Sequence, residues 1–151
     1  LNMPSLSAEE APRLKPYMKL AEQLGTLAGQ IVDKPITKIE ISYEGAATSV
    51  NTRPLTAMAL ASVLKTQSDS VNMVNAGEIA KARGIAVSET RTDECPDFHT
   101  AITLTLVTEG VTHAVRGTLF AGSAARVVGI EGVPIEAALA PAMLFIRNKD
   151  K

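Results

Sequence analysis

The sequence predicts an α+β domain with a mixed, largely antiparallel sheet covered by helices. In the N-terminal half, apolar residues recur mainly at the spacing of an amphipathic helix. In the C-terminal half, apolar and polar residues alternate as they do in strands. Helices that gather before the strands are typical of the α+β class. The length of 151 residues suits one domain of ordinary size.

The clearest helical pattern covers residues 17–31, where the apolar positions form one continuous stripe. Residues 7–10 match a capping box upstream of this helix. We expect Pro12 and Pro16 to keep the first turns irregular. Because only one face of the helix is apolar, it should pack on a sheet or on a partner subunit.

The period changes to two over residues 39–44, which predicts a strand with one face in water. Residues 45–51 are interpreted as a loop. A second helix, running to residue 64, is predicted by Thr52 in an N-cap position and Pro54 in the first turn.

A short helix over residues 79–83 is closed by Gly84, and residues 75–78 repeat the capping-box pattern before it. Asn75 is therefore a candidate helix cap. It is also a candidate ligand contact, because exposed N–H groups at a helix start attract anions. Capping alone accounts for an asparagine at this position and is the favoured interpretation.

The rest of the chain is rich in predicted strands, and residues 92–97 form a turn-rich loop between the first two of them. Gly110 marks another turn. The predicted strands cover residues 85–91, 99–109, the two arms of a hairpin within 115–132, and 143–147.

The hairpin carries basic side chains on both arms, joined by a small-residue turn at residues 121–123. Alternation places Arg116 on the same face as Thr118, and Arg126 lies just past the turn. Two guanidinium groups near a glycine-containing corner make a candidate small-anion site. The alternative is a hairpin whose arginines are only solvated.

Composition argues against several classes of function. The net charge is -1 and the pI about 6.2, so the chain lacks the basic character typical of nucleic-acid binding. A lone Cys95 forms no intrachain disulfide. No apolar run approaches the ~20 residues of a membrane span, and no export signal is recognisable, so we expect a cytoplasmic protein.

Residues that carry catalysis are scarce. His99 and His113 fall in strand patterns without a second ligand at metal-binding spacing. Cys95 precedes a proline in an acidic loop, where neighbouring carboxylates disfavour the thiolate. Phosphate-binding and dinucleotide-binding glycine motifs are missing. We therefore assign no catalytic residue, cofactor-binding residue or metal ligand to this chain.

Six stretches in a fixed order carry a family resemblance over essentially the whole chain. They are Asn2 to Pro4, Pro16 to Gly25, Val74 to Ala76 with Ala82 to Gly84, Gly117 to Gly122, Arg126 to Gly132, and Met143 to Lys151. Together they resemble the intervening, or allosteric substrate-binding (ASB), domain of bacterial D-3-phosphoglycerate dehydrogenases of the long type 1 kind. This domain is similar to one in bacterial L-serine dehydratases, so an ASB / L-serine dehydratase β-like fold is implied.

The resemblance implies an intervening domain over residues 1–142 and the first strand of a truncated ACT domain over 143–151. It also implies a parent enzyme that oxidises 3-phosphoglycerate with NAD in L-serine biosynthesis. That chemistry belongs to other domains, so no cofactor is expected in this chain. The implied role is regulation and assembly, with the other domains and subunits of a homo-oligomer, expected to be a tetramer, as partners.

Some members of the family bind an anionic effector, such as a phosphorylated hydroxy acid, through basic residues. Arg126 matches one of these positions, but residues 133–138 replace the further basic residues of those members. Arg116 or Arg147 are candidates to compensate. One alternative is a structural spacer with no small-molecule site. Another is the equivalent domain of an L-serine dehydratase, against which the segment 143–151 argues.

Overall fold

A computed structural model of the chain describes residues 10–95, 98–120, 124–130 and 133–138. In chain order the elements are α1 (Glu10–Ile31), β1 (Ile36–Gly45), the 3-10 helix η1 (Ala46–Ser49), α2 (Arg53–Lys65), α3 (Ala76–Ala82), β2 (Ala86–Thr92), β3 (Thr100–Thr108), β4 (Val111–Phe120), β5 (Ala124–Ile130) and β6 (Val133–Ala138).

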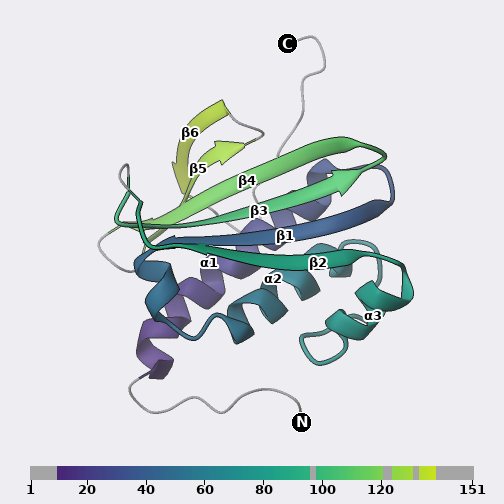
Figure 1. Cartoon of the computed structure of the whole chain (residues 1–151), viewed down its shortest axis with the longest axis horizontal. Helices are drawn as coiled ribbons and strands as arrows, with labels where there is room; N and C mark the ends of the chain where they lie inside the picture. The colour runs from purple at the N-terminus through teal and green to yellow at the C-terminus, as the bar shows by residue number, and fades with distance from the viewer. Residues whose placement is uncertain (1–9, 96–97, 121–123, 131–132, 139–151) are drawn as a thin grey trace.

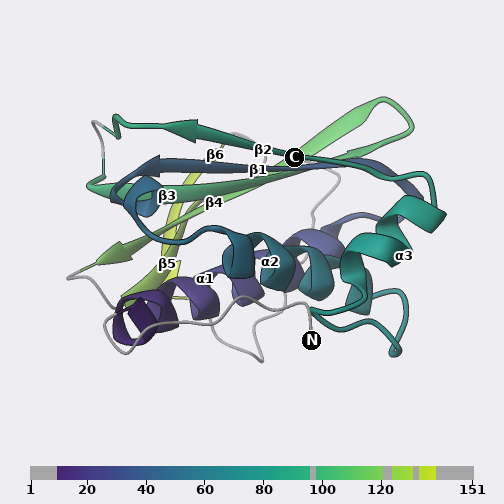
Figure 2. The same cartoon turned by 60° about the horizontal axis from the view of Figure 1, so that its bottom comes forward.

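The molecule has two layers, a sheet and the helices that cover one of its faces (Figures 1 and 2). Within the described residues the sheet has six strands in the order β2-β1-β3-β4-β5-β6. β1 and β2 are parallel, and every other neighbouring pair is antiparallel. The predicted α+β class with a mixed, largely antiparallel sheet is confirmed.

The parallel pair explains where α2 and α3 lie. Two parallel strands cannot be joined by a tight turn and need a crossover connection. Here η1, α2 and α3 make that connection between β1 and β2. The crossover places α2 beside α1 on one face of the sheet (Figure 2). Helix α3 follows α2 and contacts both α2 and β2.

Helix α1 is longer and more regular than its prolines suggest. It is α-helical from Glu10 and contains Pro16, so the expectation of irregular first turns is wrong. Pro12 lies in the first turn, where N–H groups have no partner within the helix. Around Pro16, Leu14 and Tyr17 are buried, and their packing offsets the hydrogen bond that Pro16 cannot donate.

The core lies between the helices and the inward face of the sheet. At two glycines, neighbouring elements come so close that no larger side chain would fit without a shift. A Cβ on Gly25 would lie 2.6 Å from the carbonyl oxygen of Ala59, so α1 and α2 touch there through their backbones. A Cβ on Gly117 would lie 2.7 Å from Cδ1 of Leu20, where α1 meets β4. The largest fully buried side chains include Tyr43, Leu14, Leu20, Leu24, Ile39, Ile41, Leu55, Leu64, Ile102, Leu104 and Leu106.

The C-terminal part departs from prediction in one strand. β4 and β5 pair antiparallel, as predicted for the hairpin, although its turn at 121–123 lies outside the described residues. β6 was not predicted, and Pro134 within its short run is a signal against a strand. Among the described residues β6 is an edge strand of the sheet, where a proline is tolerated. The predicted strand 143–147, and with it the proposed domain boundary at 142, lies outside the described residues.

Among the described residues, no helix combines the length and apolar character needed to cross a lipid bilayer.

Candidate functional site

The two predicted arginines of the hairpin lie on the same face of the sheet. Val115 and Gly117 point toward α1, so Arg116 between them points to the opposite, outer face. Arg126 on β5 is opposite Thr118 on β4 and therefore shares that outer face. The sequence pattern placed Arg116 on one face with Thr118, and the pairing of β4 with β5 adds Arg126 to that face.

Two phenylalanines connect these arginines. The guanidinium carbon of Arg116 lies 5.5 Å from the ring centroid of Phe98, and that of Arg126 lies 5.9 Å from the ring centroid of Phe120. The two rings meet edge to face with centroids 6.2 Å apart. Both distances between cation and ring lie within the range of cation–π attraction. We call Arg116, Phe98, Phe120 and Arg126 the Arg–Phe cluster.

The two arginines of this cluster differ in whether a carboxylate neutralises their charge. A nitrogen of Arg116 donates to Oε1 of Glu44 at 2.6 Å, and both side chains are about a quarter exposed, at 26% and 27%. The same nitrogen also donates to Sγ of Cys95 at 3.6 Å. Within the part of the chain that the structure describes, Arg126 forms no ion pair with a carboxylate. Arg126 is therefore the cluster's uncompensated positive charge.

The structure does not bring the other two predicted residues to this cluster. Arg147 lies outside the described residues. Asn75 precedes α3, which packs with α2 and β2, whereas Arg126 lies on β5 near the opposite edge of the sheet (Figure 1). The four candidate residues therefore do not form one site among the described residues.

The capping interpretation of Asn75 is also corrected. Asn75 occupies the N-cap position, but its side chain makes no capping hydrogen bond to α3. Its Oδ1 accepts from the backbone N–H of Asn72 at 2.7 Å, and its Nδ2 donates to the carbonyl of Ser70 at 3.0 Å. The side chain therefore closes the loop before α3 instead of capping it, because asparagine readily bonds to nearby backbone groups.

Sequence reasoning missed Glu44 and Phe98. Glu44 looks like an ordinary solvated residue, alternating along the wet face of β1. Only the strand register, with Glu44 opposite Ala101 on β3, places it within reach of β4. Phe98 follows a turn-rich loop, where no periodicity predicts its partner. Cys95 lies in the same loop, and its contact with Arg116 also could not be predicted from local sequence. The surroundings of the Cys95 thiol therefore include a positive charge as well as the acidic residues that neighbour it in sequence.

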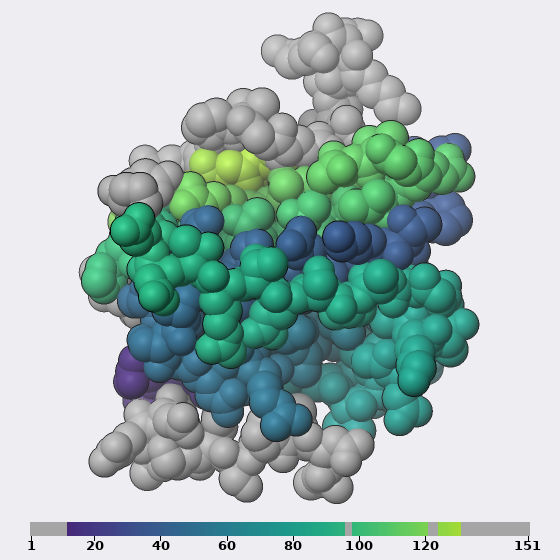
Figure 3. Space-filling view, in the orientation of Figure 1, coloured from purple at the N-terminus to yellow at the C-terminus, as the bar shows by residue number. Residues whose placement is uncertain are grey.

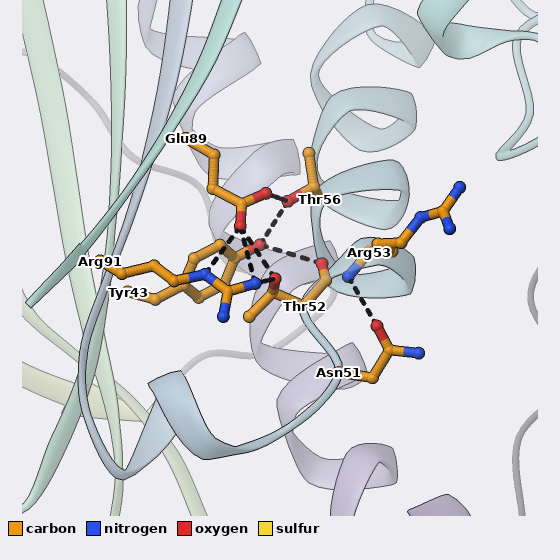
Figure 4. A network of polar contacts seen from close by, with 7 residues as sticks. All are labelled: Tyr43, Asn51, Thr52, Arg53, Thr56, Glu89 and Arg91. Carbon is orange, nitrogen blue, oxygen red and sulfur yellow. Dashed lines mark hydrogen bonds and ion pairs between the residues drawn. The ribbon is translucent and has the colours of Figure 1, made fainter. Parts of the chain in front are cut away.

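A second polar network ties β2 to α2 on the helix side of the sheet (Figure 4). The carboxylate of Glu89 accepts from the hydroxyls of Thr52 and Thr56, each at 2.8 Å. Arg91 donates to the Thr52 hydroxyl at 2.5 Å and to Glu89 at 3.3 Å. The hydroxyls of Tyr43 and Thr56 lie 2.7 Å apart. Strands β1 and β2 are thereby fixed to the start of α2.

The network changes how the start of α2 is capped. Thr52 stands at the N-cap, as predicted, but its hydroxyl makes no capping bond to the helix because it donates to Glu89. The backbone N–H of Arg53 instead donates to Oδ1 of Asn51 at 3.2 Å. The proline expected in the first turn is present as Pro54. The sequence pattern therefore located the helix start, although the hydrogen bonds there differ.

Tyr43 is the buried end of this network. Its side chain is fully buried, and burial raises the pKa of its hydroxyl, with the carboxylate of Glu89 adding to the effect. Hydrogen bonding to Thr56 and the charge of Arg91 act in the opposite direction without cancelling it. The hydroxyl is therefore neutral at neutral pH. This network is a structural tie between strand and helix.

The histidines and the cysteine belong to no metal-binding group among the described residues. His113 is buried, with Nε2 3.2 Å from the hydroxyl of Thr108. Over the described ranges, no three His, Cys, Asp or Glu side chains lie together in a group that could hold a metal ion.

Comparison with known proteins decides the family. Residues 13–131 match the family described as the D-3-phosphoglycerate dehydrogenase intervening domain. The chain belongs to this family. The resemblance inferred from the six motifs is thereby confirmed. The matched range takes in most of α1 and all of the elements from β1 to β5, so the Arg–Phe cluster lies within the intervening domain.

Two relatives are similar to this intervening domain along nearly its whole length, and a third is similar along part of it. D-3-phosphoglycerate dehydrogenase of Bacillus subtilis is 30% identical over 151 residues, covering 99% of this chain and 29% of the relative. The enzyme of Synechocystis is 32% identical over 152 residues, covering 99% of the chain and 27% of the relative. That of Methanocaldococcus jannaschii is 37% identical over 95 residues, or 62% of the chain and 18% of the relative. The chain spans less than a third of these proteins.

Proposed function

We propose that this intervening domain is a non-catalytic regulatory and assembly domain that binds a small anionic effector at Arg126. The observation that carries the proposal is the guanidinium of Arg126, which lies over Phe120 without a carboxylate partner among the described residues. A stacked guanidinium keeps its in-plane N–H donors available for an oxyanion. Phosphate and carboxylate groups are its best partners.

The other domains of the parent enzyme would carry the chemistry. They would oxidise 3-phosphoglycerate with NAD, in the cytoplasm and as part of L-serine biosynthesis. A phosphorylated hydroxy acid related to this substrate is then a natural effector. By binding one arrangement of domains more tightly than another, it would shift the activity of a homo-oligomer, which we take to be a tetramer.

The charge of the cluster limits the affinity of such a site. Glu44 compensates Arg116, so an incoming phosphate meets one uncompensated guanidinium in the cluster. Arg147, which lies outside the described residues, stays a candidate second cation. The Arg116–Glu44 pair is also the observation that favours the alternative, a structural spacer without a small-molecule site, because it leaves Arg126 as the one uncompensated charge of the cluster among the described residues.

Calorimetric titration tests the proposal. The chain would be titrated with 3-phosphoglycerate and with sulfate at low ionic strength, where screening is weakest. We expect saturable binding that Arg126→Ala weakens by about tenfold or more, because the variant loses charge-assisted hydrogen bonds. Arg83→Ala is the matched control, since Arg83 is an exposed arginine at the end of α3 that bonds only weakly to Gln67.

Two results contradict the anion site. Wild-type protein that gives no saturable heat would favour the structural spacer. Binding that Arg126→Ala and Arg83→Ala weaken equally would show a general effect of positive charge instead of a site at Arg126.

A further inference from the structure

The two edges of the sheet are built differently. The β6 edge contains Pro134, and the pairing of β6 with β5 shifts register between Val127 and Gly129. Prolines and register irregularities are devices by which proteins keep an edge strand from pairing with another chain. The β2 edge has neither, because its register with β1 runs evenly from Lys38 opposite Ala86 to Glu44 opposite Thr92.

β2 is also accessible along its length. Six of its seven residues are exposed, and Ser88 is half-buried. The strand runs across the face of the molecule seen in Figure 3, where its teal surface is uncovered. Every second residue of an edge strand points its N–H and C=O groups away from its only neighbour. The β2 edge therefore offers a row of backbone groups to another strand.

The side chains of β2 alternate in a way that suits a second copy of the same strand. Glu89 and Arg91 lie on the helix side, since they stand opposite Ile41 and Tyr43 of β1, whereas Thr90 points to the outer face. The network with Thr52 and Thr56 of α2 holds the two charged side chains in place (Figure 4). Arg91 is still 51% exposed, so it has donors left for another carboxylate.

Charge selects one register for such a pair. In an antiparallel pair of β2 strands related by a two-fold axis through Thr90, Glu89 stands opposite Arg91 of the partner subunit, and this pairing occurs twice. Moving the axis by one residue toward either end sets Glu89 opposite Glu89 or Arg91 opposite Arg91, which is unfavourable. β2 is thus complementary to itself in this register.

We propose that β2 is an interface strand, through which two copies of this domain pair edge to edge and antiparallel to form one continuous sheet. The inference rests on the assembly part of the proposed function and names its partner, a second copy of this chain. It does not depend on the anion site, because Arg126 lies on β5, near the opposite edge of the sheet.

Cysteine cross-linking tests the register. In the proposed pair, Thr90 faces its own copy, so Thr90→Cys should form a covalent dimer of the 151-residue chain on mild oxidation, seen by non-reducing electrophoresis. Thr92→Cys is the matched control, because Thr92 is exposed on the same face of the same strand, and Cys95 is common to both variants. Its two copies would stand about 13 Å apart, too far for a disulfide. Equal cross-linking of both variants, or none with Thr90→Cys, overturns the proposal.

Charge exchange tests the contact without a covalent bond. Glu89→Arg and Arg91→Glu each set like charges opposite one another, so sedimentation should show dimerisation weakened roughly tenfold or more in each variant alone. A mixture of the two variants places opposite charges together again and should recover the dimer. Circular dichroism confirms that each variant is folded.

A folded wild-type chain that stays monomeric at the highest concentration reached overturns the interface, as does a mixture no better than its components. Anion titration of the same wild-type preparation reports on Arg126 separately, so failure of the interface and failure of the anion site are distinguishable.

Discussion

At the scale of single residues, Tyr43 shows how burial between sheet and helix suppresses the ionisation of a side chain. Its hydroxyl is buried between β1 and α2, and burial raises its pKa above the ordinary value of about 10. The folded protein therefore holds this proton more tightly than the unfolded chain does. Its contribution to stability is complete below about pH 10 and is lost as the pH rises further.

We expect the free energy of unfolding to fall above pH 10 more steeply in the wild type than in Tyr43→Phe. The slope due to one such group approaches about 1.4 kcal/mol per pH unit. Denaturant unfolding between pH 8 and 11 measures the difference between the two proteins, and lysines that titrate in both cancel. Parallel curves would show that Tyr43 ionises as easily in the folded state as in the unfolded one.

Glu44 is the carboxylate that lowers the net positive charge of the Arg–Phe cluster. Its carboxylate lies 2.6 Å from Arg116, so Glu44→Gln would remove a negative charge next to the Arg–Phe cluster. We expect the affinity for sulfate or 3-phosphoglycerate at low salt to rise about threefold to tenfold, as one unit charge at short range in partly solvated surroundings allows. Glu40→Gln on the same face of β1 is the control, and an equal effect of both variants contradicts a local role for Glu44.

At the scale of elements, glycines mark where the helices come closest. At Gly25 a Cβ would lie 2.6 Å from the carbonyl of Ala59 and 2.7 Å from Cβ of Ser62, and a backbone cannot move aside cheaply. We expect Gly25→Ala to destabilise the fold by about 2 to 3 kcal/mol. Gly77→Ala in α3 has no neighbouring atom within 4 Å and should stabilise by up to about 1 kcal/mol. Chemical denaturation compares the two, and similar signs would contradict this packing.

Elements were predictable where the signal is local. The apolar stripe of α1, the alternation in β1 and the proline at the start of α2 each depend on neighbours along the chain. Predictions failed where a tertiary contact overrides a local preference. Packing of Leu14 and Tyr17 keeps α1 helical past Pro16, and Glu89, distant in sequence, takes the Thr52 hydroxyl that would otherwise cap α2.

At the scale of the whole molecule, the class of fold followed from the order of helical and strand patterns. The candidate site followed only in part. Alternation along one strand predicted that Arg116 shares a face with Thr118, whereas only the pairing of β4 with β5 places Arg126 on that face. Which residues surround them depends on the register of β1, β3 and β4, and that register brings Glu44 across two strands to Arg116. No local pattern encodes a contact of this kind.

The packing of α1 on β4 has a consequence for the newborn chain. Leu20 and Leu24 of α1 come to rest against Gly117, which the ribosome adds roughly ninety residues later. At about 5–20 residues per second, this delay is on the order of 5–20 seconds. α2 can cover the neighbouring side of α1 in the meantime, since the two helices pack together. The side that faces the sheet is not fully covered until β4 and β5 are synthesised, and during that interval a growing chain presents an apolar helix surface to chaperones and to other growing chains.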